Sequence, residues 1–180
     1  PGQLGMFGLL AYGECMFVVS AQSDEWVQFT VKKVGLVTEH LHDLAVGDEV
    51  SLRGPYGNWW PTDSCKGKDM LFIAGGIGLA PLRSVINYVR DNRADYGTVD
   101  IVYGSRSKDD LVDYPEIVNE WCQEAGIEVF LTIDREQEGW DGHVGFVPNY
   151  VKELDFKPEN TCVLICGPPI MIKFTLPGLL

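Results

Sequence analysis

The chain has 180 residues, 46% of them hydrophobic, which is enough for one domain or for two small ones, each with a buried core. Its formal net charge of −12, with 14 scattered basic residues, argues against nucleic acid as a partner. No segment approaches the run of about 20 apolar residues that spans a membrane. We interpret the loose acidic cluster at residues 109–128 as a solvated surface, and the alternative is a docking face for a basic partner.

The cysteines also exclude several kinds of site. They lie at positions 15, 65, 122, 162 and 166, an odd number with no C-x-x-C pair, which excludes a disulfide framework and an ordinary zinc or iron–sulfur ligand set. The histidines have no partners at metal-ligand spacing, so we expect no metal site. Reduced thiols favour a cytoplasmic location. Because the chain has neither an initiator methionine nor a basic leader, we expect a fragment rather than a secreted precursor.

The first part of the chain is expected to form β-strands around one short helix. The expected strands cover residues 15–20, 26–34 and 49–53, and a turn at 54–57 follows the last of them. The pattern of residues 38–44 predicts a short helix, which Gly35 precedes and for which Thr38 is the expected N-cap. These elements predict a small antiparallel β-barrel domain over residues 1–66.

From residue 67 onward, apolar strands alternate with helical patterns. The expected strands cover residues 70–74, 99–103, 127–133 and 162–166, and the expected helices cover residues 82–92, 115–125 and 148–154. An apolar stripe in the second helix is interpreted as core packing; it comprises Ile117, Val118, Trp121, Cys122 and Ala125. This alternation predicts a second domain, residues 67–180, built as an α/β parallel sheet with helices on both faces.

Two loops in this second domain indicate a ligand site. Residues 74–82 read A-G-G-I-G-L-A-P-L and join a strand to a helix, which is typical of a phosphate-binding turn. Glycines let the backbone approach an anion, and unpaired N–H groups at the helix start point at it. Pro81 stands where the common dinucleotide fingerprint has a third glycine. The sequence C-G-P-P at 166–169 also follows a strand, so both loops are expected at one edge of the sheet.

The order of these motifs resembles the ferredoxin–NADP reductase superfamily over essentially the whole chain. The matching segments are residues 34–38, 46–50, 54–57, 75–84, 103–106, 134–135, 139–140 and 166–171. Within the superfamily, the chain is most similar to the flavoprotein electron-transfer (gamma-type) subunits of cytoplasmic hydrogenases, anaerobic sulfite reductases and dihydroorotate dehydrogenase complexes. The resemblance implies a flavin-binding barrel followed by a pyridine-nucleotide domain.

The resemblance also implies two cofactor sites. The implied FAD site comprises Phe17, Val18, Val19, Ser20, Gly35, Val37, Thr38, Gly54 and Tyr56. The implied NAD(P) site comprises Gly75, Gly76, Gly78, Pro81, Ser105, Arg106, Asp134, Arg135, Cys166, Gly167 and Pro168. Cys166 stands where the family brings the nicotinamide against the flavin, so it is the expected catalytic residue, accompanying a hydride transfer between the cofactors.

Two positions bear on how these cofactors bind. The flavin strand of the family usually reads R-x-Y-S, whereas this chain has C-M-F-V at 15–18, so the Arg and Ser contacts are missing. Phe17 keeps the aromatic surface, and Ser20 is a candidate replacement for the hydroxyl.

Asp134 can accept hydrogen bonds from a ribose diol and would repel a 2′-phosphate, which favours NADH. Arg106 and Arg135 could soften that repulsion, so NADPH stays open.

We therefore expect a flavin-dependent NAD(P)H oxidoreductase subunit that passes electrons between NAD(P)H, FAD and an iron–sulfur centre of a multisubunit complex. A two-iron, two-sulfur cluster is expected in a C-terminal segment outside this chain or in a partner subunit of the hydrogenase or reductase type. N-terminal strands of the barrel are also expected to be missing. The alternative is a non-catalytic nucleotide-binding or docking subunit whose flavin site has eroded. The physiological acceptor and the direction of transfer stay open.

Overall fold

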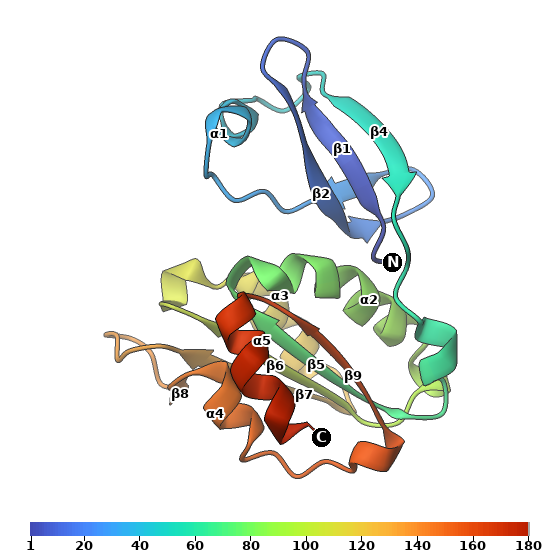
Figure 1. Ribbon diagram of the computed structural model, residues 1–180, viewed down its shortest axis with the longest axis vertical. Helices are drawn as coiled ribbons and strands as arrows, with labels where there is room; N and C mark the ends of the chain where they lie inside the picture. The colour runs from blue at the N-terminus through green and yellow to red at the C-terminus, as the bar shows by residue number, and fades with distance from the viewer. Residues whose placement is uncertain (180) are drawn as a thin grey trace.

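The computed structural model describes residues 1–179, which form two sheets that each have their own helices (Figure 1). The antiparallel sheet lies at the top of the view and the parallel sheet below it, with the N-terminus between them. This arrangement confirms the predicted two-domain fold class. Within residues 1–179, no helix combines the length and the apolar character that crossing a membrane requires.

The first sheet is antiparallel and has four strands in the order β3-β2-β1-β4. Its elements are β1 (Leu4–Leu9), β2 (Gly13–Gln22), β3 (Val27–Phe29), α1 (Leu36–His42) and β4 (Ser51–Tyr56). β1 is absent from the sequence prediction because two glycines interrupt its apolar pattern. Gly8 is needed there, since a Cβ at this position would lie 2.2 Å from the carbonyl oxygen of Gly13 in the neighbouring strand. The close approach of β1 and β2 therefore depends on this glycine.

Three expectations for this part of the chain need correction. The strand expected at 26–34 ends at Phe29, because pairing with β2 stops after the irregular register between Val19 and Ala21. Residues 54–56 belong to strand β4 rather than to a turn. Helix α1 has Gly35, not Thr38, as its N-cap. The Thr38 hydroxyl accepts hydrogen bonds from the N–H groups of residues 34 and 35, each at 2.9 Å.

The second sheet is parallel and has five strands in the order β8-β7-β6-β5-β9. Its strands are β5 (Asp69–Gly75), β6 (Val99–Ser105), β7 (Ile127–Ile133), β8 (His143–Val144) and β9 (Thr161–Cys166). The helices are α2 (Leu79–Asp91), α3 (Tyr114–Asn119), α4 (Val147–Val151) and α5 (Pro169–Thr175). The expected strands and their parallel pairing are confirmed, and only the two-residue β8 is missing from the prediction.

Alternate residues of β5 face two different cores. Phe72 packs in a cluster with residues of α2 and α3, whereas Leu71 and Ile73 pack with residues of α4 and α5. The prediction of helices on both faces of the sheet is thereby confirmed. β5 consists of buried residues on both faces except at its first position, as expected for a central parallel strand.

The helix expected at 115–125 is shorter than predicted. It forms α3 and, after a break at Glu120, a single 3₁₀ turn at Trp121–Gln123. Ile117 and Trp121 are fully buried, but Cys122 and Ala125 are exposed, because the break turns the end of the stripe away from the core. The interpretation of the stripe as core packing is therefore confirmed for Ile117 and Trp121 and wrong for Cys122 and Ala125.

Cys65 and Cys162 form a disulfide, so the expectation of reduced thiols is wrong for this pair. Cys65 lies in a short 3₁₀ helix between the two sheets, Thr62–Cys65, and Cys162 lies in β9. The two residues are 97 positions apart in sequence, and their Cα atoms are 5.7 Å apart. Spacing along the chain gives no sign of this proximity, which arises because β9 pairs with β5. Among the described residues, the other three thiols are free.

Candidate functional site

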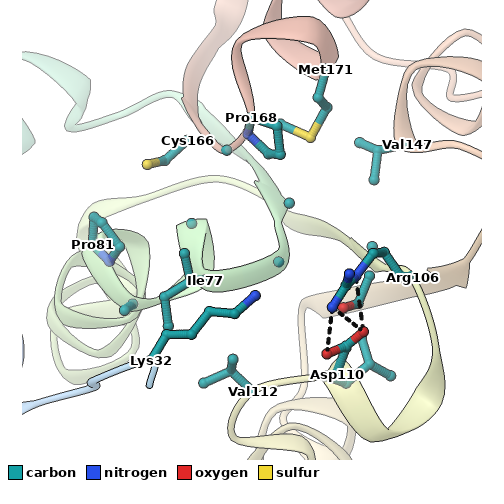
Figure 2. Close-up of a pocket in the computed structure, with 18 of the residues that line it drawn as sticks. Lys32, Ile77, Pro81, Arg106, Asp110, Val112, Val147, Cys166, Pro168 and Met171 are labelled. Carbon is teal, nitrogen blue, oxygen red and sulfur yellow. Dashed lines mark hydrogen bonds and ion pairs between the residues drawn. The ribbon is translucent and has the colours of Figure 1, made fainter. Parts of the chain in front are cut away.

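A cavity of about 1170 Å³ lies at the carboxyl edge of the parallel sheet and is lined by residues from both sheets (Figure 2). β5 pairs with β6 on one side and with β9 on the other, so the strand order reverses here. Crevices at such reversals are where open parallel sheets bind ligands. The volume exceeds the roughly 300–1,000 Å³ of common small-molecule pockets, as a site for an extended ligand requires.

Most of the residues predicted for NAD(P) come together in this cavity. Those that line it are Gly75, Gly76, Gly78, Pro81, Ser105, Arg106, Asp134, Cys166, Gly167 and Pro168. They come from the last residues of β5, β6 and β9, from the segments that follow β5, β6, β7 and β9, and from the first turn of α2. Arg135 is exposed and lies outside the lining set.

The residues predicted for FAD divide into two groups. Phe17 and Val18 of β2 line the cavity. The others lie outside it; Val19 and Ser20 are buried in β2, and the rest are Gly35, Val37 and Thr38 at the start of α1 and Gly54 and Tyr56 in β4. The Ser20 hydroxyl donates to the carbonyl oxygen of Gln28 and accepts from the hydroxyl of Thr30, each at 3.1 Å. Both hydrogen bonds of this hydroxyl therefore go to residues in or next to the first sheet.

The glycine-rich turn has two structural requirements. Gly76 has φ +54° with open space around it, so its backbone conformation favours glycine. At Gly78 a Cβ would lie 2.4 Å from the carbonyl oxygen of Cys166, and at Gly75 it would lie 2.5 Å from the Sδ atom of Met171. Gly75 and Gly78 thus allow the loop after β5 to pack directly against the loop and helix after β9.

Helix α2 begins immediately after this turn, at Leu79. The first N–H groups of a helix have no partner within it and carry the positive end of its dipole. In α2 the N–H of Leu79 bonds to carbonyl oxygens of Gly76 and Ile77, and Pro81 has no N–H, so it is mainly the dipole that makes the turn at Gly76–Gly78 and the start of α2 a cradle for an anionic group. Ile77 lies at the rim of this cradle, 40% exposed, and faces the cavity (Figure 2).

Charged groups of both signs line the cavity. Arg106 forms an ion pair with Asp110, with 3.1 Å between Nε and Oδ2 (Figure 2). Burial raises the pKa of the Asp134 carboxyl, and Arg135 and Arg106 oppose this rise. Lys32 reaches into the cavity from the segment after β3, next to Ile77. Both domains thus place basic side chains in the cavity, although the net charge of the chain is strongly negative.

Cys166 lies at the end of β9 with a free, partly buried thiol. Burial raises the pKa of this thiol, so it is uncharged at neutral pH. A neutral thiol offers a polarisable contact and a weak S–H donor rather than a nucleophile. In this state Cys166 is suited to packing against a planar ligand.

Several lining residues are missing from the sequence prediction. They include Lys32 and also Val112, Phe146, Val147 and Met171, which surround the predicted loops. Lys32 was assigned to a strand, and its sequence offers no signal that separates it from the neighbouring Lys33, which lies outside the cavity. Val147 and Met171 offer no signal of this kind either, because it is the packing of α4 and α5 that brings them to the cavity.

The fold combines an antiparallel sheet with a parallel sheet whose carboxyl edge opens onto the cavity, as in two-domain proteins with an NAD-binding domain of the oxidoreductase family. Residues 72–176 match the family model described as "Oxidoreductase NAD-binding domain", and the chain belongs to this family.

Two curated relatives from Pyrococcus furiosus match over the full length of the chain. They are the gamma subunit of sulfhydrogenase 1, at 35% identity, and the gamma subunit of sulfhydrogenase 2, at 32% identity. The chain spans 63% and 66% of their lengths, respectively. The similarity to hydrogenase gamma subunits that the sequence predicts is thereby confirmed.

Among solved structures, the fold is similar to that of a ferredoxin NADP⁺ reductase from Neisseria gonorrhoeae, a structure described as having bound FAD and NADP. The TM-score is 0.79 at 21% identity, with 99% of this chain and 77% of that chain covered. This comparison confirms the predicted two-domain fold.

Proposed function

We propose that this protein is a flavin-dependent NAD(P)H oxidoreductase module that transfers electrons between a pyridine nucleotide and FAD within a multisubunit complex. One observation carries the proposal: a single cavity is lined by Phe17 and Val18 from the first sheet and by the predicted nucleotide loops from the second. When bound, FAD accepts electrons as a pair and releases them singly, so it can link a nicotinamide to an iron–sulfur centre.

The nucleotide site has a cradle that fits a dinucleotide. Gly76 and the first turn of α2 would hold the pyrophosphate, because the positive φ of Gly76 lets the backbone approach an anion and the positive end of the helix dipole favours one there. Cys166, Gly167 and Pro168 would pack on the nicotinamide and orient it. Asp134 would accept hydrogen bonds from the adenosine ribose, with NADH favoured over NADPH.

The flavin would lie against Phe17 and Val18, on the opposite wall of the same cavity. The remaining predicted FAD residues, which lie around α1 and β4, would hold its more distant parts. The partners would be hydrogenase- or reductase-type subunits, as the names of the Pyrococcus relatives suggest. A two-iron, two-sulfur cluster would provide the electron exit, either in a partner or in a further segment of the chain.

A nucleotide-binding or docking subunit without flavin is the second candidate. It is favoured by the flavin strand, which lacks the family's Arg and Ser, and by the Ser20 hydroxyl, whose hydrogen bonds lie within the first sheet. Under this alternative the cavity would bind NAD(P) through Gly76 and α2 and would carry out no redox chemistry.

The two candidates are separated by the visible absorption spectrum of the gently purified full-length protein, recorded before and after anaerobic addition of NADH. A flavin spectrum that bleaches on addition supports the oxidoreductase. If the protein contains no flavin and binds none on reconstitution, the oxidoreductase proposal is withdrawn in favour of the docking subunit.

Cys166→Ala tests the assignment of the nicotinamide position. We expect flavin reduction to slow by about tenfold, because a small loss of packing misaligns the reacting groups, while nucleotide affinity changes little. Stopped-flow reduction and an NADH titration measure the two effects, with Cys122→Ala, an exposed free thiol, as the matched control. A loss of affinity without a change in rate would place Cys166 away from the nicotinamide.

A further inference from the structure

Arg83 is a buried cation that lies outside the cavity and joins the two sheets. It stands in α2, two residues after Pro81, and is 9% exposed. On one side its guanidinium forms an ion pair with Glu116 of α3, with 2.6 Å between Nη2 and Oε2. Asp113, at the start of α3, lies 3.5 Å from its Nε atom. These contacts anchor Arg83 in the parallel-sheet domain.

The other side of the same guanidinium faces the first sheet. Its Nη1 donates to the side-chain oxygen of Gln28 in β3 at 3.1 Å and reaches the backbone carbonyl oxygen of Ser20 in β2 at 3.5 Å. Helix α2 also packs against β2. Because the guanidinium is planar and carries several donors in fixed directions, it can bind both sides at once.

The elements that Arg83 joins are those that bear the two walls of the cavity. Ser20 lies two residues after Val18, in the strand that supplies the predicted flavin wall. Arg83 lies one turn after the glycine-rich turn that supplies the predicted nucleotide wall. A displacement at this contact would therefore change the distance between the two walls.

We propose that Arg83 is a positioning residue that fixes the flavin-bearing strand β2 against the nucleotide-bearing loop and thereby sets the alignment for electron transfer. The proposal rests on the function proposed above. Misplacement of reacting groups by about 1 Å can cost a hundredfold in rate without loss of binding. The competing interpretation is that Arg83 only ties α2 to α3, which would affect stability alone.

Arg90 provides a matched control on the same helix. Its Nε atom pairs with Glu124 at 2.6 Å, the same distance as in the pair between Arg83 and Glu116. Among the described residues, its hydrogen bonds go to Asn87 and Glu124 and none to the first sheet. Arg90→Met thus removes a comparable ion pair without touching the contact between the sheets.

The experiment compares full-length wild type, Arg83→Met and Arg90→Met under anaerobic conditions. Three quantities are measured: the limiting rate of flavin reduction at saturating NADH, the Kd for NADH, and the long-wavelength charge-transfer absorbance of the nicotinamide stacked on the flavin. For Arg83→Met we expect a limiting rate at least tenfold lower and a weaker charge-transfer band, with Kd changed less than about threefold. Arg90→Met is expected to keep the wild-type rate and band.

Equal rates and bands in Arg83→Met and Arg90→Met would overturn the positioning role. If Arg83→Met does not fold, Gln28→Leu replaces it, because this change keeps the pair with Glu116 and removes the shorter of the two contacts between Arg83 and the first sheet, leaving only the 3.5 Å approach to the carbonyl oxygen of Ser20. A wild-type rate in Gln28→Leu would then overturn the role. If the wild type itself holds no flavin that NADH or NADPH reduces, the proposed function fails, and the positioning role fails with it.

Discussion

At the scale of single residues, the two glycines of the turn after β5 act in different ways. Gly78→Val would place side-chain atoms against the backbone of Cys166, so the two loops must separate. We expect nucleotide affinity to fall by at least tenfold and the free energy of unfolding to fall by about 1–3 kcal/mol. Gly76→Ala meets no protein neighbour, so we expect it to lower the free energy of unfolding by about 1 kcal/mol of left-handed strain and to weaken nucleotide binding less than Gly78→Val does. NADH titration and urea unfolding measure the two effects, and equal affinities in both variants would contradict this distinction.

The sequence predicted Gly78 as a site of close approach by a ligand. In the structure its nearest neighbours are the backbone atoms of residues 166 and 167. The glycine pattern reveals that something must come close, but the identity of that neighbour depends on β9 pairing beside β5. Strand order is set by long-range pairing, which the local pattern does not encode.

Asp134→Ser tests cofactor choice. Removing the carboxylate should raise the preference for NADPH over NADH by about tenfold, because a charge that repels the 2′-phosphate is lost. Since burial raises the pKa of this carboxyl, its charge is lost at a higher pH than that of an ordinary Asp. Wild-type discrimination should therefore weaken as pH falls towards this raised pKa, and the Ser variant should lack this trend. The kcat/KM ratio for the two nucleotides, measured against pH, tests both expectations; parallel profiles would remove Asp134 from specificity.

At the scale of elements, β6 and β7 contain a like-charge pair. Asp100 of β6 stands opposite Glu128 of β7, and burial, with the charge of Glu128 next, raises the pKa of the Asp100 carboxyl. When the pKa of a carboxyl is higher in the folded than in the unfolded protein, the free energy of unfolding is highest at pH values below the unfolded-state pKa. It then decreases as pH rises through the folded-state pKa. Asp100→Asn should therefore stabilise the protein by about 0.5 kcal/mol at pH 7 and leave it unchanged near pH 3. Urea unfolding at both pH values measures this, and an equal effect at both would exclude a charge mechanism.

The elements differ in how far their sequences determine them. β5 and β7 could be predicted closely because long apolar segments have few alternatives to a buried strand. Residues 30–34 could not, because their alternating pattern fits a strand, whereas β3 is an edge strand whose pairing ends at Phe29. The freed segment instead brings Thr30, Val31 and Lys32 to the cavity. The same departure from the strand pattern thus produces part of the candidate site.

At the scale of the whole molecule, the cavity exists only because the two sheets meet. The loops after β5 and β9 could be predicted as a ligand edge from sequence, since each follows an apolar strand. The opposite wall at Phe17 and Val18 entered only through the resemblance to a family. The contacts of Arg83 with both sheets could not be predicted, because the helical pattern of residues 82–92 does not show which elements pack on either side of an arginine.

Lys32 tests whether the first sheet contributes charge to nucleotide binding. The net charge of −12 repels an anionic dinucleotide, and Arg106 is paired with Asp110. Of the lysines that line the cavity, Lys152 follows α4 of the second domain, whereas Lys32 comes from the segment after β3 of the first. We expect Lys32→Met to weaken NADH binding roughly fivefold at low salt and to reduce the salt dependence of Kd, since a nearby attraction is removed. Lys33→Met, at an exposed neighbour outside the cavity, is the matched control. Titrations from low to physiological ionic strength measure both variants; if they match each other, Lys32 acts only through the overall charge, and the nucleotide site needs no cation from the first sheet.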